Sequence, residues 1–108
     1  MAALAVKTET FKWVEGADSI SSYTAAVRDE PPPYRTAFCK HCGSPMPIVD
    51  PERPYVVIQA GCLDDDPGTR PFRHIFVGVK ASWYEIHDGL PQYEGRLPPD
   101  QRLPYKRQ

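Results

Sequence analysis

The chain has 108 residues, with 13 basic and 14 acidic side chains and a net charge of −1. This length fits one domain with a modest core, and the balanced charge argues against a nucleic-acid-binding surface. No apolar run approaches membrane-spanning length, and residues 1–6 are too short for a signal peptide. Three cysteines, an odd number, argue against a disulfide framework, so we expect a cytoplasmic protein with no membrane partner.

Thirteen prolines interrupt the chain and favour short strands over long helices. Alternating or β-branched residues predict strands, in chain order, at 11–14, 20–23, 34–38, 46–49, 55–60 and 74–79. Turns are predicted at 15–18 and 64–68, and short helical turns at 25–27 and 81–86. The sequence therefore predicts a mainly β fold, in which the strands around residue 42 form a hairpin.

The strongest chemical signal is the pair Cys39 and Cys42, which has C-x-x-C spacing and is followed by Gly43. A tight turn of this kind lets two thiolates face one metal ion, and glycine adopts the positive φ that such a turn needs. Three interpretations stay open: half of a zinc site, a thioredoxin-like redox pair, and a metal-free turn. The redox interpretation is disfavoured because Pro45 and Pro47 oppose the helix that should follow such a motif.

Other candidates for chemistry are Cys62, His74 and His87, which lie on separate segments with no ligand-like spacing. We expect His74 to be a hydrogen-bonded structural residue and His87 to be exposed. The acidic run Asp64–Asp66 precedes Pro-Gly, which is typical of a turn and not of a metal site.

Several segments in order resemble the glutathione-dependent formaldehyde-activating enzyme (GFA) family, which includes centromere protein V. The segment 38–45, Phe-Cys-Lys-His-Cys-Gly-Ser-Pro, resembles the family's second cysteine motif. Further resemblances lie at Phe11-Lys12-Trp13 with Gly16, Gly61-Cys62-Leu63-Asp64-Asp65, His74-Ile75, Ala81-Ser82-Trp83-Tyr84 and Asp88-Gly89-Leu90-Pro91-Gln92-Tyr93. Together they cover residue 4 to about residue 93.

The resemblance implies a β-tent, built of small antiparallel sheets that meet at zinc knuckles, and a strand over residues 2–6. It also implies carbon–sulfur lyase chemistry on glutathione–aldehyde adducts at a zinc ion. In the family, an N-terminal segment supplies a C-x-C pair that completes the structural zinc site and a C-x-C-x-x-C motif that holds the catalytic zinc. The resemblance therefore identifies Cys39 and Cys42 as structural zinc ligands, and no residue of this chain matches the catalytic ones. Cys62 matches no cysteine of the family pattern.

We therefore expect a GFA-like β-tent without its N-terminal zinc-ligand segment over residues 1–95, followed by an extended tail over 96–108. The expected function is that of a GFA-family carbon–sulfur lyase which this chain alone does not complete; the alternative is a non-catalytic zinc-knuckle module. We expect a glutathione adduct as the small-molecule ligand. An uncovered sheet edge would favour a homodimer or a complex with a partner.

Overall fold

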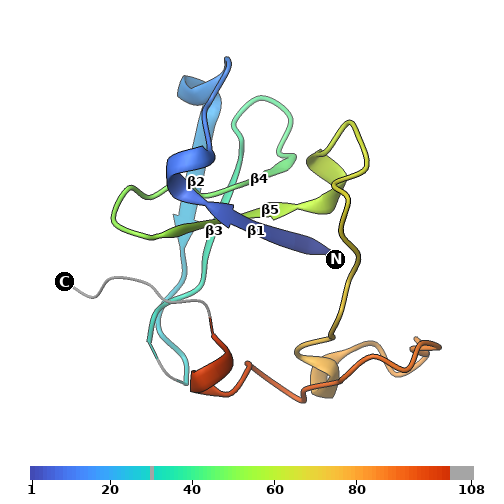
Figure 1. Ribbon diagram of the computed structural model, residues 1–108. Coiled ribbons are helices and arrows are strands. Elements are labelled where there is room, and N and C mark those ends of the chain that lie inside the picture. The colour runs from blue at the N-terminus through green and yellow to red at the C-terminus, as the bar shows by residue number, and fades with distance from the viewer. Residues whose placement is uncertain (30, 103–108) are drawn as a thin grey trace. The chain divides into compact units, whose positions relative to one another are not determined.

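Small antiparallel sheets and short 3-10 turns make up the regular structure of the protein, as the computed structural model shows for residues 1–29 and 31–102 (Figure 1). The predicted mainly β fold is thereby confirmed. The chain divides into two units, one over residues 1–65 and one that begins at Asp66. Within the described ranges, no helix has the length and apolar character needed to cross a membrane.

The first sheet of the N-terminal unit pairs β1 (Ala3–Lys7) with β5 (Tyr55–Gln59) in antiparallel register. Val6 lies opposite Val56, and Leu4 lies opposite Ile58. Because side chains alternate across a strand, these four residues share one face of the sheet. That face is the inner one, since Val56 is fully buried whereas its neighbour Val57 is 50% exposed.

The second sheet has the order β2–β3–β4, formed by Ile20–Thr24, Arg35–Cys39 and Pro45–Met46. Ile20 lies opposite Cys39, and Ala37 lies opposite Met46. Ala37 is only 3% exposed, so the face that carries it is packed against the rest of this unit. Figure 1 shows the loop that joins β3 to β4 at one end of this sheet.

The strands predicted at 20–23, 34–38 and 55–60 correspond to β2, β3 and β5, and the expected strand at residues 2–6 is β1. The strand predicted at 46–49 is shorter than expected, because regular pairing stops at Met46. Residues 25–27 form no helical turn.

The strand predicted at 11–14 is wrong. The Phe11 amide instead donates to the Thr8 carbonyl and closes a 3-10 turn over Thr8–Thr10. The Phe11 and Trp13 rings then pack edge to face, with their centroids 5.2 Å apart. The alternating aromatic pattern therefore reflects a local ring contact and not pairing with a neighbouring strand.

The strand predicted at 74–79 is also wrong. His74 forms one isolated bridge with Gln92, and Val77–Val79 is a 3-10 turn. Phe76 has φ 57°, which is left-handed and incompatible with a continuous strand. Its amide donates to the Gly95 carbonyl, and this contact from the C-terminal segment favours the turn.

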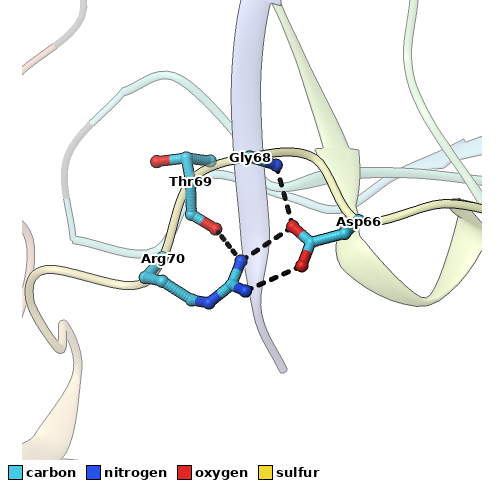
Figure 2. Close-up of polar contacts among 4 residues, drawn as sticks. All are labelled: Asp66, Gly68, Thr69 and Arg70. Carbon is cyan, nitrogen blue, oxygen red and sulfur yellow. Dashed lines mark hydrogen bonds and ion pairs between the residues drawn. The ribbon is translucent and has the colours of Figure 1, made fainter.

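The C-terminal unit begins with a turn that is closed by Asp66, the last residue of the acidic run (Figure 2). Asp66 accepts a hydrogen bond of 2.8 Å from the Gly68 amide and forms a two-pronged ion pair with Arg70, at 2.7 and 2.8 Å. These contacts lower the pKa of the Asp66 carboxyl, with the Arg70 side chain as the largest cause. The predicted turn at 64–68 agrees with this arrangement, and Gly68 has φ 77°.

The domain boundary predicted at residue 95 stays a prediction. The tail expected over 96–108 falls partly outside the described residues. Residues 99–101 form a 3-10 turn, and the Arg102 side chain donates to the Leu97 carbonyl at 2.7 Å.

Candidate functional site

The turn between β3 and β4 brings Cys39 and Cys42 together. Two backbone hydrogen bonds of Cys39, one through its amide and one through its carbonyl, close this turn. The Cys39 amide donates to the Ser44 carbonyl at 2.9 Å, and the Cys39 carbonyl accepts from the Gly43 amide at 2.7 Å. Gly43 has φ 77°, the left-handed conformation that the sequence predicted for it. Two backbone hydrogen bonds and the left-handed Gly43 therefore define the shape of the turn.

The side chains of this turn interact through sulfur. Cys42 Sγ lies 3.2 Å from Ser44 Oγ. The pKa of the Cys42 thiol is lowered, chiefly by the Ser44 side chain, then by the Ser44 backbone and by the Cys39 side chain. A lowered thiol pKa favours the thiolate, which is the form that binds metals and attacks electrophiles. The sequence analysis did not name Ser44 as part of the candidate site. Its position two residues after Cys42 could have indicated a contact with the thiol.

The base of the turn is tied to β2. The Lys40 amide donates to the Ser19 carbonyl at 2.8 Å, which continues the pairing of β2 with β3 by one further residue. Cys39 is consequently half-buried at the end of β3, whereas Cys42 is exposed. One sulfur is thus anchored in the sheet and the other faces solvent.

Cys62 lies close to this hairpin, which its place in the sequence did not indicate. It ends the 3-10 turn Ala60–Cys62 that follows β5, and its Sγ is 3.6 Å from the Pro45 carbonyl. Gln59 links the same two segments, because its Nε2 donates to the Met46 carbonyl at 3.4 Å. Even so, no group of three or more His, Cys, Asp or Glu side chains suited to a metal ion occurs among residues 1–29 and 31–102.

The two histidine candidates, His74 and His87, differ in their hydrogen bonds and in their exposure. His74 Nε2 is 3.0 Å from both carboxylate oxygens of Asp88, which also accepts the Leu90 amide at 3.0 Å. The pKa of Asp88 is lowered by the Leu90 amide and then by His74. His74 is therefore hydrogen-bonded, as we expected, and its structural role stays a prediction. The His87 side chain is 82% exposed and lies 3.7 Å from Glu85.

Comparison with known protein families gives one decisive result. The profile of the family described as glutathione-dependent formaldehyde-activating enzyme matches residues 1–79, which is most of the chain and includes the Cys39–Cys42 turn. The chain belongs to this family. Searches of curated proteins and of solved structures gave no match.

Membership of the GFA family makes the thiols of Cys39 and Cys42 candidate metal ligands. Two thiols on one tight turn fit half of the tetrahedral sulfur set that structural zinc prefers. The lowered pKa of Cys42 and its contact with Cys39 agree with that use. Zinc ligation by Cys39 and Cys42 remains a prediction.

Proposed function

We propose that this GFA-family chain is a zinc-binding β domain in which Cys39 and Cys42 act as two ligands of a structural zinc ion. The observation that carries the proposal is the closed β3–β4 turn, in which the Cys42 thiol contacts Ser44 and interacts with the Cys39 side chain. Sulfur ligands select zinc over magnesium and calcium. Bound zinc would supply a cross-link that fixes the end of the second sheet.

The reaction class that we propose is the family's: making or breaking a carbon–sulfur bond in a glutathione–aldehyde adduct. A catalytic zinc needs three protein ligands and one open position for the substrate. Cys62 lies beside β4, whereas His74 is engaged with Asp88 in the C-terminal unit. We therefore propose that catalysis requires ligands beyond these 108 residues, and that the chain by itself is a zinc-binding module.

The metal proposal is tested by competition between the purified chain and a chromophoric zinc chelator. Cys39→Ser and Cys42→Ser should each abolish competition, because one thiolate of the pair is lost. Cys62→Ser is the matched control and should leave zinc affinity unchanged. Equal affinity in all four proteins would contradict the assignment of the ligands.

The reaction proposal is tested by NMR exchange spectroscopy of formaldehyde and glutathione at equilibrium. We expect the chain to leave the exchange rate between free and glutathione-bound aldehyde unchanged, with or without zinc. Acceleration in proportion to added protein would refute the incomplete-site proposal, and its loss in Cys62→Ser would identify a different active site.

A further inference from the structure

We propose that Arg35 is a carboxylate-binding residue that holds an anionic small molecule at the start of β3. Arg35 begins this strand and Cys39 ends it, so the site is separate from the Cys39–Cys42 turn and needs no metal ion. The inference rests on the proposed function in one choice only: glutathione, which carries a carboxylate at each end, is the ligand to test first.

The first argument is an unpaired donor. Nε of Arg35 is enclosed by the protein and has no hydrogen-bond partner. Among the buried and half-buried residues of 1–29 and 31–102, it is the only enclosed side-chain nitrogen or oxygen in this condition. Folded proteins rarely leave such a group unpaired, because it has lost its hydrogen bonds to water and gained none in return. A carboxylate that accepts from this nitrogen removes that cost, which favours its binding.

The second argument is charge. Arg35 is half-buried and lies two residues before Ala37, on the same inner face of the second sheet. A guanidinium is always protonated, and in such a position it normally has a carboxylate beside it. Arg70 has one, since it forms the two-pronged ion pair with Asp66. No carboxylate of residues 1–29 or 31–102 pairs with Arg35, so its charge has no counter-ion within the described chain.

The third argument is the backbone of the same residue. The Cys39 amide donates to the Ser44 carbonyl, on the β4 side of β3. In an antiparallel pair every second residue directs its amide to the same neighbour, so the Arg35 amide also faces the β4 side. β4 ends at Met46, which lies opposite Ala37, and therefore offers Arg35 no partner. The residue with the unpaired Nε thus also has a backbone amide without a strand partner on that side.

These features define the chemistry of the ligand. Several N–H donors, a fixed positive charge and no acceptor select an oxoanion over a neutral or cationic molecule. The planar fork of arginine matches the two oxygens of a carboxylate, and a small rotation of the half-buried side chain would present Nε–H and one terminal N–H to them. Chloride has no pair of oxygens to match the fork, so carboxylates should bind more tightly than chloride.

The test is an NMR titration of the full, isotope-labelled chain, kept metal-free by a pyridine-based chelator, in which the Arg35 Nε–Hε resonance is followed. The probes are S-methylglutathione, which has no free thiol, and sodium acetate, at an ionic strength held constant with sodium chloride. We expect both probes to shift this resonance to saturation, and S-methylglutathione to reach half-saturation at a lower concentration because it makes further contacts. If acetate binds equally well, the ligand is a simple carboxylate and not glutathione.

Variants at Arg35 lack the reporter nitrogen, so their affinity is read from the Thr36 amide. Arg35→Lys keeps the charge without the planar fork and should weaken binding by roughly 10-fold, and Arg35→Gln should abolish it. Arg28→Gln is the matched control, because it removes the same charge from an exposed residue of the same unit and should leave the affinity unchanged.

The outcomes separate this inference from the zinc proposal. Cys42→Ser, which should lose zinc, should keep the Arg35 shift. A resonance that moves with neither probe, or that chloride shifts as much as acetate does, would overturn the carboxylate site and leave zinc binding by the hairpin intact. The same follows if Arg35→Gln binds S-methylglutathione as tightly as the unchanged chain does.

Discussion

Replacing Gly43 by alanine tests whether the conformation of the turn matters to the metal site. Gly43 has φ 77°, and a β-carbon built on it meets no atom within 4 Å. The substitution therefore introduces no clash, and its cost comes only from the left-handed backbone. For a residue with a β-carbon that cost is about 1–2 kcal/mol. At fixed free zinc, the zinc-loaded chain should lose this much free energy of unfolding.

The effect on zinc affinity depends on whether the turn keeps its conformation when no metal is bound. If the strained turn relaxes when zinc is absent, the affinity should fall by roughly 5- to 30-fold, which is the same energy expressed as an equilibrium constant. Chelator competition measures the affinity, and urea unfolding at fixed free zinc measures the stability.

Two matched variants make the Gly43 result interpretable. Gly61 also has open space around a built β-carbon but lacks a positive φ, so Gly61→Ala should be close to neutral. Gly43→Asn should cost less than Gly43→Ala, because asparagine tolerates the left-handed region better. The reasoning is refuted if Gly43→Ala and Gly61→Ala have the same zinc-loaded stability.

Two further predictions concern the sheets and the C-terminal unit. Val56→Ala should lower the free energy of unfolding by about 2–3 kcal/mol, since two buried carbons are lost at about 0.8 kcal/mol each and a cavity remains. Val57→Ala, on the exposed face, should cost about 1 kcal/mol or less. Equal losses of the two variants in urea unfolding would contradict the assigned inner face. Because the folded-state pKa of Asp88 lies below its ordinary 3.8, its contribution to stability is present above that value and is lost as the pH falls through the lowered pKa. An NMR titration should show the Leu90 amide shifting in that acidic window, and Asp88→Asn should remove the shift; a midpoint at or above the ordinary value would argue against the contact.

Local sequence patterns were sufficient for β2, β3 and β5, whereas β1 was expected only from the family resemblance. β5 is a run of β-branched and aromatic residues between Pro54 and a glycine, and β3 alternates before the first cysteine of the pair. The turn at Gly43 was equally predictable, because the C-x-x-C-G spacing and the positive φ are both local properties. The GFA family assignment also needed only motifs and their order.

Only the tertiary structure decided the contacts between segments that are distant in sequence. The pattern at 74–79 favours a strand, yet the amides of residues 76–78 donate to the carbonyls of residues 93–95, and Phe76 is held in a turn. The closeness of Cys62 to the hairpin and the pairing of His74 with Asp88 are likewise set by chain folding. Spacing along the sequence carries no information on which loops meet. The candidate ligand pair could be predicted because both thiols sit on one turn. Cys62 contacts β4 only because β4 and β5 lie together in the fold.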